Sequence, residues 1–381
     1  MKFSLSGHIL KNSWSLKLWE EKVFLISIML AALTSLMATP KLSYIDFKVV
    51  LCLFNLMVVG CAFEELKILD KVAIRILNSC NNLRLVNFVM LLLIFLSSML
   101  LTNDVALLTF VPITLIISKK VNINPMEMVI FQTLAANIGS SLTPMGNPQN
   151  LFLFIHYGIT AAQFFKVMIP FVFLGALWIL ALNLSISKKN FNIIINPVQI
   201  KSKKQAILFG ILFIVIIFSI FNLISYIFAF VLTVSVVIFM NRSLIKKVDF
   251  FLLATFVCFF IAIGNISHIE LVNKYLTYLL SSSNKIFFTS VILSQFVSNV
   301  PAAILVANFT SSWKEVLIGV NVGGLGTLIA SLASVISYKM YVNEAGAENS
   351  SGYLIKFTLY NFSGLILFVA INFLLLHFNA I

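Results

Sequence analysis

The apolar positions of this chain form long runs, without the regular polar spacing of a soluble helix or strand. Most runs have about 17 to 25 residues, the length that an α-helix needs to cross a bilayer. They predict crossings near 23–38, 44–62, 125–158, 163–186, 205–223, 225–241, 249–265, 313–338 and 354–378. The pattern therefore predicts an all-α polytopic membrane protein with about nine transmembrane helices.

Two further apolar stretches are each divided by a polar tripeptide. Thr102-Asn103-Asp104 divides 85–118, and Ser298-Asn299-Val300 divides 285–310. The arms on either side have about 10 to 17 residues, which is short for a full crossing. We therefore predict two re-entrant hairpins with polar tips inside the membrane.

Two of the predicted crossings contain a polar break with glycine. The break in 125–158 reads Asn137-Ile138-Gly139-Ser140-Ser141-Leu142-Thr143, and the break in 313–338 reads Asn321-Val322-Gly323-Gly324-Leu325-Gly326-Thr327. Both follow the spacing Asn-(Ile/Val)-Gly-x-x-x-Thr. Unpaired backbone groups are tolerated at membrane depth only where protein or a hydrated cavity satisfies them. The paired hairpins and broken helices thus predict a duplicated membrane site.

Composition and charge placement agree with this class. The chain has 60% hydrophobic residues, 10% charged residues and a mean hydropathy of +1.05, too little polar surface for a soluble globule. Its net charge of +13 would suit nucleic-acid binding, but most of its 26 Lys and Arg residues lie in short connections on one predicted face. We therefore expect no nucleic-acid partner, a cytoplasmic N-terminus and a C-terminus outside.

The same orientation makes the two halves inverted copies, because the first hairpin enters from inside and the second from outside. We predict a first inverted repeat at 1–186, a cytoplasmic linker and connecting helix at 187–224, and a second repeat at 225–381. Each repeat has two helices, an amphipathic stretch, a hairpin, a broken helix and a closing helix. The amphipathic stretches are 64–79 and 268–280, and they suit helices that lie in the membrane interface.

Asp104 is the acid that this topology places well inside the membrane, where an ionised carboxylate costs about 2.5 to 3.5 kcal/mol. A bound Na⁺ or a titrating proton, with Thr102 and Asn103 as further oxygen ligands, would offset that cost. Alternatively, Asp104 caps a helix at the far interface of an ordinary two-helix hairpin. Val300 stands in the matching position of the second hairpin, so that copy would bind a cation with neutral oxygens alone.

The helical arms that follow the breaks predict where an anion would bind. Arms beginning at Val105 and Pro301, and others near Leu151 and Leu328, would direct four helix N-termini at one cavity near the midplane. Helix N-termini bind anions through free amides and the helix dipole. The alternative is a set of packing glycines and capping residues between ordinary helices.

The segment from Gly139 to Asn150, with Leu101 to Leu108 before it, resembles the ion transporter superfamily. Within it, the chain resembles the citrate-transporter-like anion permeases, which are related to divalent anion/sodium symporters and arsenite permeases. The first broken helix of the symporters reads Gly-x-x-x-Thr-x-x-Gly-Thr-Pro-x-Asn, and this chain keeps the pattern with Asn147 in place of the second Thr. The acid at Asp104, where the symporters have Thr, is closer to arsenite permeases and sodium/proton antiporters.

The resemblance implies a scaffold part and a transport part that moves as an elevator, commonly in a homodimer. The cation-binding positions that it implies, together with Asp104, are Thr102, Asn103, Asn137, Gly139, Ser298, Asn299 and Gly323. The substrate-facing positions are Asn103, Thr143, Pro144, Asn147, Pro148, Asn299 and Thr327. Na⁺ would be the coupling ion, and no other cofactor is implied.

The sequence therefore predicts a secondary active transporter in the cytoplasmic membrane, which moves a small carboxylate or inorganic oxyanion coupled to Na⁺ or H⁺. A sodium/proton antiporter or an arsenite efflux permease of the same superfamily is the alternative. A channel could use the same hairpins, but matching broken helices in inverted repeats favour alternating access. An intramembrane enzyme is not indicated, because the chain has no His-Glu-x-x-His motif and its four His residues are scattered.

Overall fold

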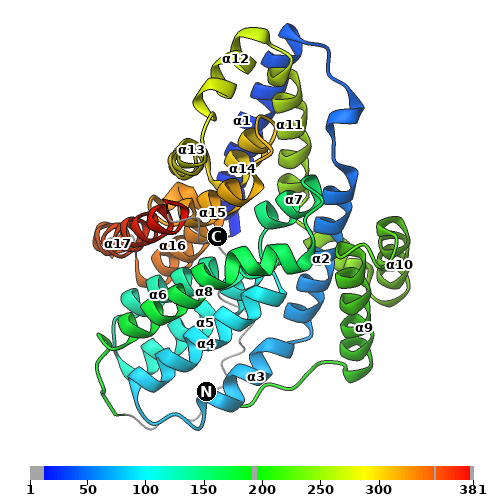
Figure 1. Ribbon diagram of the computed structural model, residues 1–381. Helices are drawn as coiled ribbons and strands as arrows, with labels where there is room; N and C mark the ends of the chain where they lie inside the picture. The colour runs from blue at the N-terminus through cyan, green and yellow to red at the C-terminus, as the bar shows by residue number, and fades with distance from the viewer. Residues whose placement is uncertain (1–12, 191–194, 347–348, 378–381) are drawn as a thin grey trace.

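The computed structural model describes residues 13–190, 195–346 and 349–377, and over these residues the protein is built of helices (Figure 1). The first half contains α1 (Ser13–Met37), α2 (Phe47–Glu65), α3 (Ile68–Leu77), α4 (Leu83–Leu100), α5 (Asn103–Val121), α6 (Met126–Ser140), α7 (Pro148–His156) and α8 (Ala161–Asn183). The second half, after the connecting helix α9 (Lys203–Ile220), contains α10 (Tyr226–Met240), α11 (Phe250–Ser267), α12 (Glu270–Leu279), α13 (Ser283–Val297), α14 (Asn299–Ala307), α15 (Trp313–Gly323), α16 (Leu332–Ala345) and α17 (Ser350–His377). Short 3₁₀ helices lie at η2 (Leu42–Tyr44), η3 (Arg242–Lys247) and η4 (Leu328–Ala330).

The order of elements repeats, and equivalent helices of the two halves pack against each other's half in a reciprocal way. α1 packs along α11 while α10 packs along α2, so the first two helices of each half pair with the other half. Similarly, α5 packs against α16 and α14 packs against α7. Such reciprocal packing is the arrangement that approximate two-fold symmetry between repeats produces. The division into repeats at 1–186 and 225–381, and their inversion across a membrane, stay predictions.

Length and composition confirm the polytopic class. Within the described residues, six helices are long and apolar enough to cross a membrane, namely α2, α4, α8, α9, α11 and Ser350–Leu374 of α17. Val23–Met37 of α1 and all of α10 are apolar but shorter. Large apolar side chains such as Leu36, Phe239 and Ile366 are exposed on the outer helices, where lipid would cover them.

The first hairpin is longer than its sequence suggested. Its arms, α4 and α5, have 18 and 19 residues, and an 18-residue helix is about 27 Å long. The apolar pattern underestimated them because polar residues occupy the outer turns: Asn82 caps α4, and Lys119 and Lys120 lie in the last turn of α5. The second hairpin has the predicted short arms, 15 residues in α13 and 9 in α14.

Both predicted amphipathic stretches form helices. α3 buries Ala73, Ile74 and Leu77 against the protein. In α12, by contrast, Leu271 and Tyr275 are largely exposed, which is typical of a helix whose apolar face meets lipid rather than protein.

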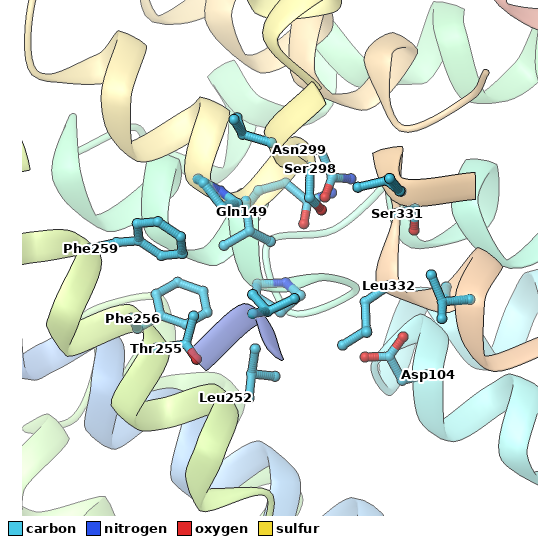
Figure 2. Close-up of a pocket in the computed structure, with 18 of the residues that line it drawn as sticks. Asp104, Gln149, Leu252, Thr255, Phe256, Phe259, Ser298, Asn299, Ser331 and Leu332 are labelled. Carbon is cyan, nitrogen blue, oxygen red and sulfur yellow. The ribbon is translucent and has the colours of Figure 1, made fainter. Parts of the chain in front are cut away.

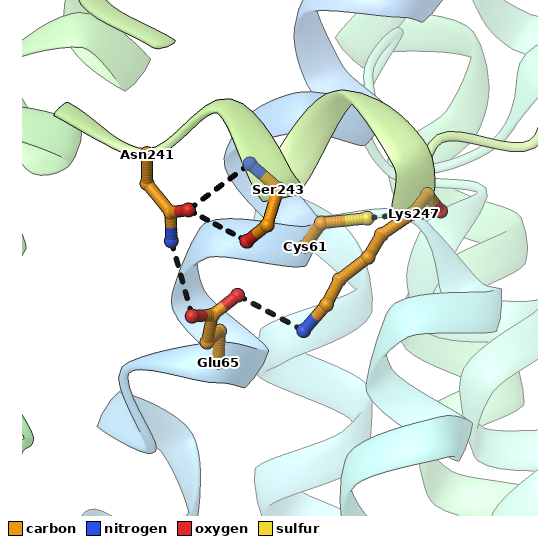
Figure 3. A network of polar contacts seen from close by, with 5 residues as sticks. All are labelled: Cys61, Glu65, Asn241, Ser243 and Lys247. Atoms are coloured by element: carbon orange, nitrogen blue, oxygen red, sulfur yellow. Dashed lines mark hydrogen bonds and ion pairs between the residues drawn. The ribbon is translucent and has the colours of Figure 1, made fainter. Parts of the chain in front are cut away.

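A polar network fixes the end of α2 to η3, just before α11 (Figure 3). Lys247 Nζ lies 2.9 Å from Glu65 Oε2, and Asn241 Nδ2 donates to Glu65 Oε1 at 3.0 Å. Asn241 Oδ1 accepts from the amide of Ser243 at 3.1 Å, and Cys61 Sγ donates to the Lys247 carbonyl at 3.5 Å. Because the ion pair is partly exposed, it contributes at most about 1 kcal/mol. Its effect is to position the turn that leads into α11.

Candidate transport site

Both hairpin tips and both helix breaks border one pocket with a volume of about 330 Å³ (Figure 2). The hairpin tips, the breaks and the helix starts that follow them contribute residues that include Asn103, Asp104, Pro148, Gln149, Ser298, Asn299, Val300, Pro301, Ser331 and Leu332. These residues come from segments that are far apart in the chain. The two copies of the motif that the sequence shows therefore contribute to one shared pocket.

The N-termini of four helices meet at this pocket, as predicted. α5 begins at Asn103, α7 at Pro148, α14 at Asn299 and α16 at Leu332, and each of these residues belongs to the lining. The first residues of a helix leave backbone amides unpaired and carry a partial positive charge. The pocket can therefore attract an anion although, among the described residues that line it, none is Lys, Arg or His.

Asp104 does not cap its helix. Thr102 is the N-cap of α5 and makes no side-chain cap bond, while Asp104 is the second helical residue. Its Oδ1 is buried and has no hydrogen-bond partner within the described residues. A carboxylate oxygen left unpaired in a pocket wall is a ready ligand for a cation or a proton. The position thus favours the ion-binding interpretation over the capping one.

A second acid, Asp249, lines the same pocket, and the sequence interpretation missed it. Asp249 caps α11 by accepting from the amide of Leu252 at 2.8 Å. Its position as the first residue of the predicted crossing 249–265 was the available signal, but an acid at the end of an apolar run also suits an ordinary interfacial cap.

The first hairpin tip is bonded to the break between α6 and α7. The amide of Asn103 donates to the Gly146 carbonyl at 3.0 Å, and Asn103 Nδ2 donates to Asn137 Oδ1 at 3.2 Å. Asn137 Oδ1 also accepts from Ser331 Oγ at 3.0 Å, which links the first half to the start of α16. Asn137 therefore lies behind the pocket and holds Asn103 in its wall.

Asn321, at the second break, bonds to the first break. Its Oδ1 accepts from Ser141 Oγ at 2.8 Å and from Asn147 Nδ2 at 3.4 Å. Its Nδ2 donates to Asn150 Oδ1 at 2.7 Å. Asn147 was predicted to face substrate, but its side-chain Nδ2 points toward Asn321 of α15. Its Oδ1 accepts from the Asn150 amide, so Asn147 is the N-cap of α7.

The two motif threonines occupy equivalent structural positions. Thr143 Oγ1 donates to the carbonyl of Met99, and Thr327 Oγ1 donates to the carbonyl of Gln295 at 2.9 Å. Met99 and Gln295 each lie three residues before a hairpin tip, before Thr102 and Ser298. The threonines therefore fix each break to the first arm of its hairpin, rather than facing the pocket as predicted.

The two motif glycines allow close helix packing. A Cβ at Gly139 would lie 2.5 Å from the Phe95 carbonyl oxygen, and one at Gly323 would lie 2.7 Å from Ser294 Cβ. Neither glycine belongs to the pocket lining. Of the predicted site residues, the structure places Asn103, Asp104, Pro148, Ser298 and Asn299 in the lining. It places Thr102, Asn137, Gly139, Thr143, Pro144, Asn147, Gly323 and Thr327 behind or beside it.

The hairpin tips differ in backbone conformation as well as charge. Ser298 has φ +76° and ψ 155°, whereas Thr102 has φ −64° and ψ 148°. A non-glycine residue with this positive φ costs about 1 to 3 kcal/mol. Ser298 lies in the pocket wall, so the strain is located at the candidate site.

A family model described as citrate transporter matches residues 16–313. The chain belongs to the citrate transporter family. The matched residues include both hairpins and the first break, whereas the second break lies beyond them. The chain is therefore a multi-pass membrane transporter, as its resemblance to the ion transporter superfamily implied.

Two similar proteins agree with a membrane transporter. An uncharacterized transporter of Methanocaldococcus jannaschii is 34% identical over 318 residues, which cover 83% of this chain and 87% of the relative. The inner membrane protein YbiR of Escherichia coli is 29% identical over 310 residues, covering 78% and 80% of the two chains. Both similarities therefore cover most of the helices described above.

Gln295 is a further residue of the site that the family pattern did not indicate. Its Nε2 donates to the carbonyls of Gly323 at 2.7 Å and Leu325 at 3.1 Å, and its Oε1 accepts from the Thr327 amide at 2.9 Å. It thereby pairs backbone groups that the second break leaves free. A lone Gln in an apolar arm was the available signal.

Replacing Gln295 by leucine should lower both thermal stability and transport. Each buried group left unpaired costs about 1 to 3 kcal/mol, so we expect the melting temperature to fall by several degrees. Gln205→Leu, in the first turn of α9, is the matched control, because within the described residues Gln205 bonds through its backbone amide and its side chain makes no hydrogen bond. Equal melting temperatures for the two variants, measured by fluorescence in detergent, would contradict this role.

Proposed function

We propose that this chain is a secondary active transporter that moves a small carboxylate or inorganic oxyanion across the cytoplasmic membrane, coupled to Na⁺ or H⁺. The observation that carries the proposal is the meeting of four helix N-termini at one pocket. Amides and dipoles at helix N-termini are an anion site that needs no basic side chain. Membership in the citrate transporter family supports transport as the activity.

The coupling cation belongs at the first hairpin tip in this proposal. Asp104 offers a buried oxygen that has no hydrogen-bond partner in the described part of the chain, and the side-chain amide of Asn103 lies beside it in the pocket lining. Negative charge on Asp104 disfavours an anion in the pocket until a cation or proton neutralises it. Occupation of Asp104 would therefore precede anion binding, which is the order that coupled transport requires.

The proposed mechanism is alternating access by a homodimer. In each protomer the two hairpins enter the membrane from opposite faces and move together as one transport part. The reciprocal packing of α5 on α16 and of α14 on α7 supports this part as a unit, because it interlocks the two halves around the pocket. Helix pairs α1 with α11 and α2 with α10 would form the surrounding scaffold.

The second candidate is cation exchange, as in a sodium/proton antiporter, or arsenite efflux. The observation that favours it is a pocket with two acids, Asp104 and Asp249, and no basic residue within its described lining. An antiporter would use the carboxylates alone and would bind no anion between the helix N-termini.

Proteoliposomes distinguish the two candidates. Radiolabelled citrate, succinate, sulfate and arsenite should be offered with imposed Na⁺ or pH gradients, and we expect at least one anion to accumulate in a gradient-dependent way. Proton efflux on addition of Na⁺, without accumulation of any anion, would refute anion transport and support the antiporter. Flux at channel rates that no substrate saturates would refute both.

A further inference from the structure

The pocket has two unlike walls. One wall carries the helix N-termini and the polar groups of Asn103, Asn299 and Ser331. Figure 2 shows Phe256 and Phe259 of α11 on the opposite side from Asp104 and Ser331. Leu252 of the same helix and Ile26 and Leu30 of α1 extend this second wall. Asp249 and Thr255 are the polar residues that α11 adds to the lining, and over the rest of this side a fully hydrated, multiply charged anion would meet hydrocarbon.

Charge balance limits the anion that the pocket can hold. A helix N-terminus is equivalent to about +0.5 elementary charge, so four contribute about +2. Asp104 and Asp249 oppose this with two negative charges when both are ionised. One bound cation or proton leaves an excess of about one positive charge. The site therefore matches a single negative charge, and each further carboxylate would be buried without compensation.

From these two observations we propose that the substrate is an amphipathic monoanion, with one carboxylate-like group and an apolar aliphatic or aromatic body. The charged group lies at the helix N-termini near Asn299, and the body packs on Leu252, Phe256 and Phe259. A pocket of about 330 Å³ suits a small molecule of this kind. This inference rests on the proposed anion transport and specifies its substrate class.

Binding of alkanesulfonates tests the proposal, since these probes stay ionised and do not leak through lipid as protonated fatty acids do. Methane-, butane- and hexanesulfonate should be titrated calorimetrically into the purified full-length protein with Na⁺ or at low pH. We expect the dissociation constant to fall about fourfold per methylene, as burial of apolar surface implies. Succinate, citrate and sulfate should compete more weakly than hexanesulfonate.

Variants of the apolar wall locate the body of the ligand. Phe259→Ser should weaken hexanesulfonate binding about tenfold or more while changing methanesulfonate binding less than about twofold. Leu252→Ala, a smaller change, should give the same pattern if the first variant folds poorly. Phe250→Ser is the matched control on the same helix, because Phe250 lies outside the pocket lining and is half exposed.

Two failures are distinguishable. Accumulation of citrate, succinate or sulfate in proteoliposomes, with affinities for the sulfonates that do not depend on chain length, would overturn this inference and leave anion transport standing. Absence of binding and of gradient-driven accumulation for every anion in both series would overturn the inference and the proposed function together.

Discussion

Asp104→Asn is expected to abolish cation-driven transport without unfolding the protein. Asparagine keeps the shape of the side chain but removes the charge, and losing one partner of a buried charge interaction costs about 2 to 5 kcal/mol. Transport driven by a Na⁺ or pH gradient should therefore fall about 30-fold or more. Because the oxygen of Asp104 has no partner within the described residues, the variant should be at least as heat-stable as the native protein without Na⁺.

Asp46→Asn is the matched control for this substitution. Asp46 caps α2 by accepting from the Val49 amide at 3.1 Å, and asparagine caps helices equally well. Its transport and melting temperature should not change. Initial rates in proteoliposomes and melting curves with and without Na⁺ are the measurements. Fully cation-dependent transport by Asp104→Asn would refute the coupling role of this carboxylate.

Gly146→Ala is expected to cause the second large loss. A Cβ at Gly146 would lie 2.1 Å from the Ser140 carbonyl oxygen, a backbone atom that cannot move without changing the break. The Gly146 carbonyl also accepts from the amide of Asn103, so a shift there would displace the first hairpin tip. Overpacking costs about 1 to 3 kcal/mol, and we expect transport to fall about tenfold or more with a lower melting temperature.

The control is the same substitution at Gly210 in α9, where a Cβ would meet no atom of another described segment within 4 Å. Gly210→Ala should leave transport unchanged and stabilise the helix by up to about 1 kcal/mol. The decisive comparison is between the two alanine variants in one transport assay. Normal transport by Gly146→Ala would mean that the break tolerates displacement, and the proposed link between break and hairpin tip would be wrong.

The hairpins, breaks and amphipathic helices were predictable because each is a local property of the sequence. A polar tripeptide inside an apolar run must interrupt a helix or be satisfied, as at Thr102-Asn103-Asp104, and this holds whatever the rest of the fold does. The lengths of α4 and α5 were less predictable, since terminal polar residues such as Lys119 extend a helix beyond its apolar part.

The candidate site was predictable in its segments and less so in its side chains. Of the predicted site residues, Asn103, Asp104, Pro148, Ser298 and Asn299 line the pocket, and their roles in binding stay predictions. The motif threonines do not line it, because the last turn of a hairpin's first arm leaves carbonyls unpaired that a nearby hydroxyl must satisfy. Which hydroxyl is nearest depends on how the break packs against the hairpin.

By itself, the sequence determined the membrane class, the duplicated order of hairpin and broken helix, and the difference between a charged tip at Asp104 and an uncharged one at Val300. Hydrophobic run length and polar interruptions act within a segment, so they can be read without knowledge of its neighbours. Only the tertiary structure decided that four helix N-termini share one pocket, that Asp249 lines it as well as Asp104, and that apolar residues of α1 and α11 contribute to its lining. These properties depend on which distant segments pack together, and packing geometry between helices is not encoded in any single apolar run.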